Sequence, residues 1–259
     1  MKSFAFKRLS IAAAAILAIG NAMAASNIVI TEVDPAGSGT GSGSYNNDWF
    51  ELTNTGTTAQ DITGWSMLDN HAASNTTSPY SGTISIGNSS GSVLLTGITS
   101  IAAGQTVVFL DATGVSSTSA EIAKFEAAWF GANLPANFTI GTYATGSGQS
   151  AVGLSTSTDM VNIFSGSATN SALVASVAFG ADTGAGTFDN TAGLNNATLT
   201  TKSVVGVNGA FASATGGEIG SPGVVASVPE ADGFALAFVG FGALVAMRRG
   251  KKSAPKTQG

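Results

Sequence analysis

The chain has 259 residues, enough for one large or two small domains; 44% of them are hydrophobic and only 10% are charged. It has no cysteine, which excludes disulfides, thiol nucleophiles and Cys-based zinc sites. Eight of the ten basic residues lie near the two ends, so residues 25–227 hold two basic and thirteen acidic side chains and carry a formal charge of −11. A body this acidic repels phosphate backbones, and we expect no nucleic-acid partner.

The first 24 residues have the pattern of a secretory signal peptide. Three basic side chains come first: Lys2, Lys7 and Arg8. An apolar run over residues 9–19 follows, and then the small residues Ala22 and Ala24 mark a cleavage site before Ala25. We therefore expect export through the secretion translocon. An uncleaved anchor is the alternative, but the run is shorter than the roughly 20 residues that span a bilayer.

Three strands are expected next, at Ile28–Val33, Asp48–Thr53 and Asp61–Leu68, with Gly64 as a bulge or kink in the third. In the second of these strands, successive side chains should point to opposite faces. Phe50 and Leu52 should therefore share one face of the sheet, and Trp49 and Glu51 should share the other.

The segments IVITEVDP, DWFELTNTG and DITGWSMLDN, which cover residues 28–70, resemble the opening strands of the lamin tail domain family. Later stretches are similar to that family's later strands and its closing motif: Val107–Asp111, Val174–Gly180 and Gly220–Gly223. Residues 72–100 depart from the family pattern and are interpreted as an insertion. The resemblance implies an all-β fold, an immunoglobulin-like β-sandwich with insertions, over residues 25–215.

One segment predicts a helix within this β pattern. Thr118–Glu121 has the form of a capping box, and Gly131 follows as a stop. Apolar residues at helical spacing lie between them: Ile122, Phe125, Trp129 and Phe130. Such a stripe favours core packing over an aromatic binding face.

Further strands are expected at Met160–Phe164, Leu173–Phe179 and Thr201–Val207. Residues 216–227 are rich in Gly, Ser and Pro, which is typical of a linker. We expect this linker to join the sandwich to a separate tail, residues 228–259.

The tail begins with Val228, Pro229 and Glu230 and continues into an uncharged apolar run, Gly233–Met247. Basic residues then stop the run, beginning with Arg248 and Arg249. Fifteen helical residues extend about 22 Å, against a hydrocarbon core of about 30 Å, so we expect a marginal transmembrane helix. The basic cluster places the C-terminus in the cytoplasm and the body outside. A stable anchor is the alternative to a temporary one.

These tail residues are similar to the PEP-CTERM sorting signal, although Ala231 stands where that family usually has proline. The resemblance implies an exosortase-type processing enzyme as a partner. It also implies transient anchoring in the inner membrane, removal of the tail, and delivery to the cell surface, the outer membrane or the extracellular matrix.

No catalytic or metal site is expected, and no cofactor, because His71 is the only histidine and no nucleophile motif accompanies it. The favoured hypothesis is a non-enzymatic structural or adhesive protein of an exopolysaccharide or biofilm layer. A second is a module that binds carbohydrate through exposed aromatic residues, named as Tyr45, Trp49 or Trp65, or that binds Ca²⁺ through its acids. A third is a hydrolase that uses Glu32 and Glu51.

Overall fold

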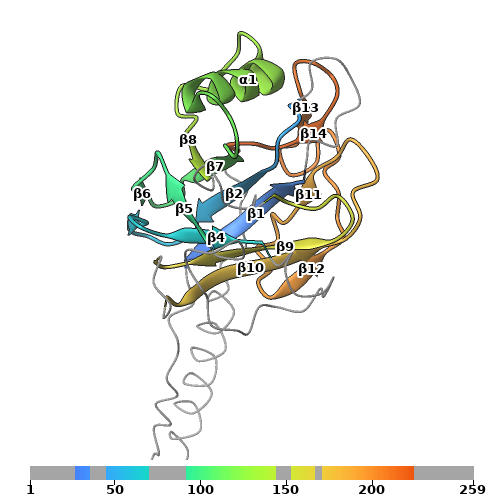
Figure 1. Ribbon diagram of the computed structural model, residues 1–259. Helices are drawn as coiled ribbons and strands as arrows, with labels where there is room; N and C mark the ends of the chain where they lie inside the picture. The colour runs from blue at the N-terminus through green and yellow to red at the C-terminus, as the bar shows by residue number, and fades with distance from the viewer. Residues whose placement is uncertain (1–26, 36–44, 70–91, 144–152, 167–170, 225–259) are drawn as a thin grey trace, which may run out of the picture.

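The computed structural model describes residues 27–35, 45–69, 92–143, 153–166 and 171–224 (Figure 1). These residues form short strands and one helix, which confirms the mostly β character expected from the sequence. The expected signal peptide, His71 and the expected sorting tail all lie outside the described residues.

Ten strands follow one another through hydrogen bonds in the order β11-β1-β2-β7-β8-β5-β4-β9-β10-β12. The strands of the first layer are β1 (Ile28–Asp34), β2 (Trp49–Asn54), β5 (Val93–Thr96), β7 (Thr106–Asp111), β8 (Ile140–Tyr143) and β11 (Phe188–Asp189). Those of the second layer are β4 (Ser66–Leu68), β9 (Asp159–Phe164), β10 (Leu173–Phe179) and β12 (Ala197–Leu199). Two further pairs stand apart: β3 (Gln60–Asp61) with β6 (Ser100–Ile101), and β13 (Phe211–Ala212) with β14 (Ile219–Gly220).

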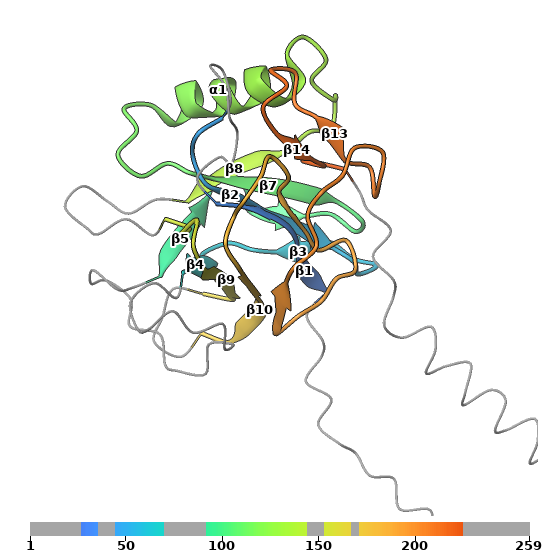
Figure 2. The ribbon, with the colours of Figure 1, turned by 90° about the vertical axis from the view of Figure 1, so that its right-hand side faces the viewer.

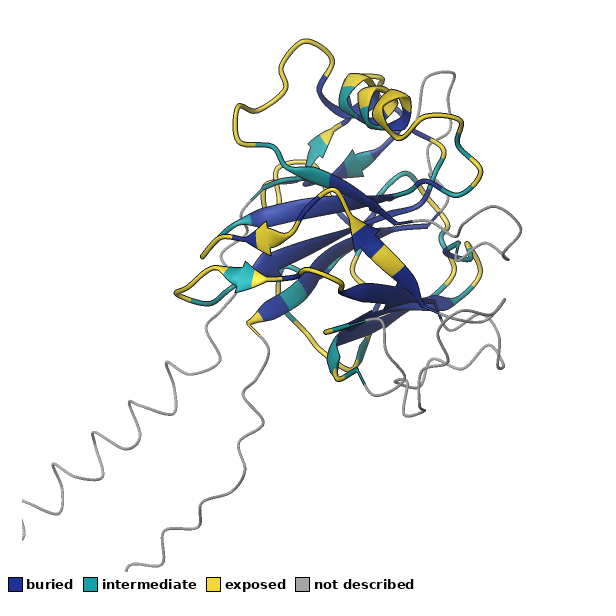
Figure 3. Ribbon diagram, turned by 60° about the vertical axis from the view of Figure 1, so that its left-hand side comes forward, coloured by how far each residue is buried: buried dark blue, intermediate teal, exposed yellow. Residues whose placement is uncertain are grey.

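The hydrogen-bonded series of strands folds back on itself at β5, which pairs with β8 in the first layer and with β4 in the second. The two layers therefore pack face to face. Alternate side chains of each strand fill the space between the layers, including Phe50, Leu52, Val161 and Val177. Most strand pairs are antiparallel, and β7–β8 and β10–β12 are parallel. Most residues of the long strands are buried, as the dark blue arrows in Figure 3 show. The arrangement is a β-sandwich.

The helix α1 (Thr118–Phe130) covers the outer face of the first layer, on the side away from β9 and β10 (Figure 1). Phe125 and Trp129 pack there against Trp49 in edge-to-face contacts. The core interpretation of the aromatic stripe is therefore confirmed, and so is the alternation that places Trp49 opposite Phe50. The helix stops at Gly131 as expected, but its N-cap is Ser117 and not Thr118.

Four expectations differ from the structure. The third strand, expected at 61–68, is divided into β3 and β4 by a turn in which Gly64 has φ 75°. Of residues 201–207, expected as a strand, only the first few pair in this way, through an antiparallel bridge between Lys202 and Phe188, and a turn follows at residues 205–206. The expected insertion at 72–100 contains β5, which joins the two layers. The expected linker contains β14, and residues 216–224 pack onto the body.

Candidate functional site

A β-bulge in β1 places a polar cluster on the outer face of the first layer. The register between β1 and β2 shifts between Ile30 and Glu32, after which Glu32 lies opposite Glu51. Because side chains otherwise alternate between faces, a bulge is what allows two consecutive polar residues, Thr31 and Glu32, to reach the same side. The result is a pair of glutamates on adjacent strands, each with a relative exposure of 1%.

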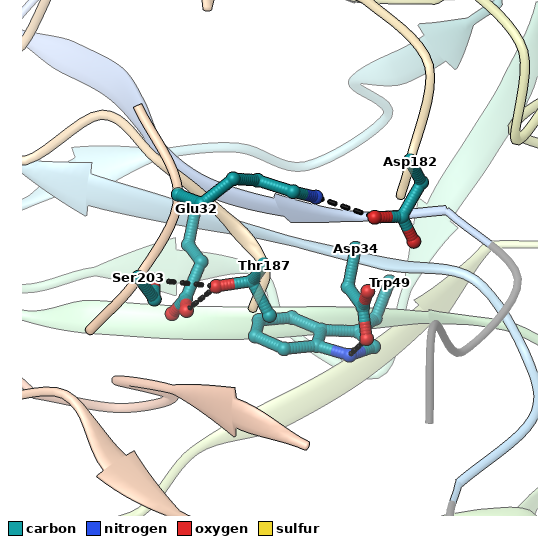
Figure 4. Close-up of polar contacts among 7 residues, drawn as sticks. Glu32, Asp34, Trp49, Asp182, Thr187 and Ser203 are labelled. Carbon is teal, nitrogen blue, oxygen red and sulfur yellow. Dashed lines mark hydrogen bonds and ion pairs between the residues drawn. The ribbon is translucent and has the colours of Figure 1, made fainter. Parts of the chain in front are cut away.

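Glu32 is held by residues from distant parts of the chain (Figure 4). Its Oε1 accepts hydrogen bonds from Thr187 Oγ1 and from the backbone N–H of Ser221, the latter at 2.8 Å. Its Oε2 accepts from Ser221 Oγ at 3.2 Å. A further hydrogen bond of 2.7 Å joins Thr187 Oγ1 to Ser203 Oγ. Both oxygens of this buried carboxyl group are therefore satisfied from within the protein.

Glu51 is held in the same way. Its Oε1 accepts from Thr31 Oγ1 at 2.6 Å, and its Oε2 accepts from the backbone N–H of Gly223, also at 2.6 Å. Hydrogen bonds continue from Thr31 to Thr53 at 3.0 Å and from Thr53 to Thr106 at 2.9 Å. This row of hydroxyl groups crosses three adjacent strands, and its hydrogen bonds hold the carboxyl group of Glu51 in place.

Two more buried acids lie beside this pair. Asp34 Oδ2 accepts a hydrogen bond of 2.9 Å from the indole Nε1 of Trp49, as Figure 4 shows. Glu218 is fully buried, and the backbone N–H of Tyr45 is directed toward its carboxyl group. Together, Glu32, Asp34, Glu51 and Glu218 form what we call the acid cluster.

Burial dominates the electrostatics of the acid cluster. It raises the pKa of Glu32 to about 7, although hydrogen bonds from Thr187 and Ser221 act in the opposite direction. Burial also raises the pKa of Glu218 to about 7. The pKa values of Asp34 and Glu51 are raised well above the ordinary range, first by burial and then by neighbouring acids. Near neutral pH the cluster therefore retains protons that exposed carboxyl groups would have lost.

The C-terminal segment Glu218–Val224 covers the acid cluster. Two of its glycines approach neighbouring side chains so closely that a larger residue would not fit. A Cβ atom at Gly220 would lie 2.5 Å from Glu32 Oε1 and 2.9 Å from the ring of Trp129. Gly223 has φ 75°, and a Cβ atom there would lie 2.5 Å from Phe138. These residues belong to the stretch GSPG that resembled a closing motif. The structure shows what it does, since it carries two backbone donors to two buried glutamates.

This geometry contradicts the hydrolase hypothesis. The sequence correctly singled out Glu32 and Glu51, and the structure brings them together. Their oxygens, however, are occupied by donors of the same chain, and their side chains do not reach solvent. A hydrolytic pair needs both carboxyl groups open to a substrate and a water molecule. The pair instead fastens the C-terminal segment to the sheet.

The exposed aromatic platform expected for carbohydrate binding is also contradicted, because Tyr45, Trp49 and Trp65 are all buried. Trp65 belongs to the core between the layers, and Trp49 and Tyr45 belong to the core beneath α1. Within the described ranges, no group of three or more His, Asp or Glu side chains is placed to hold a metal ion.

A surface pocket of about 470 Å³ lies between α1 and residues 45–47. Its wall includes Asn46, the exposed Lys124 and the buried carboxylate of Glu121. Glu121 accepts hydrogen bonds from Asn47 Nδ2 and from Lys124 Nζ, the second at 3.0 Å. The buried side chain of Tyr45 also lines the pocket, next to Asn47 and Glu121. The pocket therefore offers neutral and paired polar groups beside an apolar floor of two alanines.

The remaining residues singled out from the sequence cannot be placed. Those of signal-peptide cleavage (Ala22, Ala24, Ala25), of the sorting motif (Val228, Pro229, Glu230) and of the basic stop (Arg248, Arg249) lie outside the described residues. Across the part of the chain that is described, no helix combines the length and apolarity needed to cross a membrane.

Comparison with known proteins agrees with the fold. The family model of the lamin tail domain matches residues 21–181, which is more than half of the chain. No curated protein matches. The matched range ends before β11 and before the segment Glu218–Val224. Even so, β11 pairs with β1, and Ser221 donates a hydrogen bond to Glu32, both inside the matched range. The chain belongs to the lamin tail domain family.

Proposed function

We propose that this protein is an exported lamin tail domain protein, displayed at the cell surface or in an extracellular matrix by an exosortase-type sorting system. Its role there is structural or adhesive and not enzymatic. The proposal is supported by the sequence patterns at both ends of the chain and by the immunoglobulin-like, non-enzymatic character of the domain family.

One structural observation supports the proposal: the described chain already reaches the acid cluster before the sorting motif begins. The last contacts of the described chain are made by Ser221, Gly223 and Val224, whose N–H donates to the carbonyl of Ser221 at 2.9 Å. Val228 follows four residues later. Removal of the tail at the motif would leave in place all the donors to the acid cluster that lie in the described ranges. The tail can therefore act as an address that is discarded without loss of the fold.

The experiment replaces Val228, Pro229 and Glu230 together with alanine in the producing organism and follows the protein by cell fractionation. Wild-type protein should reach the surface or the medium, whereas the variant should remain in the inner membrane at full length. A matched control replaces Pro255, Thr257 and Gln258, which lie beyond the basic cluster, and should be sorted as wild type is. Equal surface delivery of the motif variant would contradict the proposal.

A second candidate function, binding of a neutral carbohydrate, is favoured by the pocket beside α1. Its ion pair leaves no net charge, and its amide, hydroxyl and carboxylate groups suit a ligand rich in hydroxyl groups. Asn46→Ala should weaken binding of the purified body to matrix polysaccharide in a pull-down titration. Asn133→Ala, an exposed asparagine outside the pocket, should not change it. Equal binding by both variants and the wild type would remove this candidate.

A further inference from the structure

One loop exposes an unusual concentration of apolar side chains. The large hydrophobic residues exposed within the described ranges are Leu94, Leu134, Leu194, Val204, Val205 and Val207. Half of them therefore lie within four consecutive residues, with relative exposures of 58%, 55% and 50% for Val204, Val205 and Val207. We call this stretch the valine loop, residues 204–207. Single exposed apolar residues need no explanation, but three at one tip form an apolar surface that favours contact.

The valine loop is held in shape by its own hydrogen bonds. The N–H of Val207 donates to the carbonyl of Val204 at 2.9 Å, and the N–H of Gly206 donates to that of Ala210 at 2.8 Å. Asn208 adopts the left-handed conformation, with φ 50°, and its side chain donates to Asp189 at 2.8 Å. The loop therefore presents its valines in a fixed arrangement, and little conformational entropy remains to be lost when they are buried.

The last described residue, Val224, lies beside this loop. A Cβ atom at Gly209 would lie 2.6 Å from Cγ1 of Val224, so the last described residue packs against the base of the valine loop. The loop leads into β13, on the side of the body opposite β5 in Figure 2. Only residues 225–232 separate Val224 from the apolar run that begins at Gly233. Fully extended, this stretch reaches about 30 Å.

We propose that the valine loop lies on the lipid surface of the inner membrane, on its outer side, while the tail is inserted. This inference rests on the proposed function, because it takes the apolar run as the membrane segment. A short tether at Val224 holds the adjoining face of the body near the bilayer at a high effective concentration. The valines on that face then enter the boundary between headgroups and acyl chains.

The charges near the loop indicate that the contact is apolar and not electrostatic. Lys202, next to the loop, is paired with Asp182 and stacks over Phe188 at 3.6 Å from the ring centroid. Residues 25–227 as a whole carry a charge of −11, which opposes attraction to anionic lipids. The contact between the valine loop and the lipid should therefore be insensitive to salt. It should form only while the inserted tail holds the body close to the membrane. Removal of the tail would then release the body from the membrane completely.

The experiment uses the lack of cysteine in the full-length chain. Val205→Cys is labelled with an environment-sensitive fluorophore and reconstituted into vesicles of phosphatidylcholine that contain lipids with a quencher at the headgroup boundary. Leu94→Cys, similarly exposed at 45% but on β5, is the matched control. Resistance of the protein to extraction at high pH reports insertion of the tail independently.

With the tail inserted, the probe at position 205 should emit at shorter wavelength than the probe at position 94 and should be quenched by the labelled lipid, with no change on adding salt. Equal, water-like emission from both probes in the inserted protein would overturn the loop proposal and leave the proposed function standing. A blue-shifted but unquenched probe would mean that the loop is buried against protein, such as a second copy of the chain, and would also overturn it. Extraction of the whole chain at high pH would instead overturn the membrane segment itself, and the loop contact with it.

Discussion

Replacement of Glu32 by glutamine should flatten the dependence of the domain's stability on pH. Glutamine keeps the shape of the side chain and one acceptor oxygen for Thr187 Oγ1 and the N–H of Ser221. Its amide can donate to Ser221 Oγ, which faces the second oxygen in the wild type. The substitution therefore removes a titrating group while retaining most of its hydrogen bonds.

The expected magnitude follows from the pKa. Burial raises the pKa of Glu32 from 4.5 to about 7, so protonation of this group favours the folded state. That contribution is fully present below pH 4.5 and is lost as the pH rises through 7. A shift of this size corresponds to about 3 kcal/mol in total, of which about 2 kcal/mol is lost between pH 5 and pH 8. The wild type should therefore be more stable at pH 5 than at pH 8.

The assay is denaturant unfolding of residues 25–227 at a series of pH values, followed by tryptophan fluorescence. Glu32→Gln should show a fall in unfolding free energy between pH 5 and pH 8 that is smaller than the wild type's by about 2 kcal/mol. The remaining fall belongs to the other buried acids. Asp61→Asn is the control, since Asp61 is exposed and its pKa is lowered by hydrogen bonds from Thr63, so it titrates below this range. A pH dependence in Glu32→Gln as steep as that of the wild type would refute the reasoning.

Three further predictions concern the same body. Gly223→Ala should cost about 2 to 4 kcal/mol, because it combines a positive φ with a clash, whereas Gly216→Ala, with φ 74° and open space, should cost only about 1 kcal/mol in thermal or chemical unfolding. Ser117→Ala should cost about 1 kcal/mol as the loss of an N-cap, and Ser119→Ala less than about 0.5 kcal/mol in the same assay; equal costs would contradict the cap. Truncation after residue 215 should abolish cooperative unfolding in circular dichroism, and truncation after residue 227 should preserve it.

Much of the sandwich could be predicted from the sequence, because period-two alternation and the helical stripe directly reflect which side chains are buried. Leu173–Phe179 was predicted with its observed bounds, and α1 nearly so. The strand expected at Thr201–Val207 is present only at its start, where Lys202 pairs with Phe188, and valine's preference for strands misled the prediction for the rest. There the chain turns at Gly206 and Asn208, both with positive φ, and the valines that suggested a strand are exposed to solvent.

The acid cluster could be predicted only in part. The sequence pointed to Glu32 and Glu51, but glutamate is ordinarily a surface residue, and burial depends on donors that lie far along the chain. Those donors include Ser221 and Gly223, in a stretch whose Gly and Pro content is also typical of a linker. Composition does not distinguish a flexible linker from a segment that needs glycine for close packing, so the contact had to be seen in the structure.

The most direct test of the account is the intact mass of the protein recovered from the cell surface and the medium. The account predicts a chain that begins at Ala25 and ends between Val224 and Gly233, so that the closing segment is retained and the apolar run is lost. A surface form that still ends at Gly259 would contradict the removable tail. A form that ends before Ser221 would contradict the role of the closing segment in the mature fold.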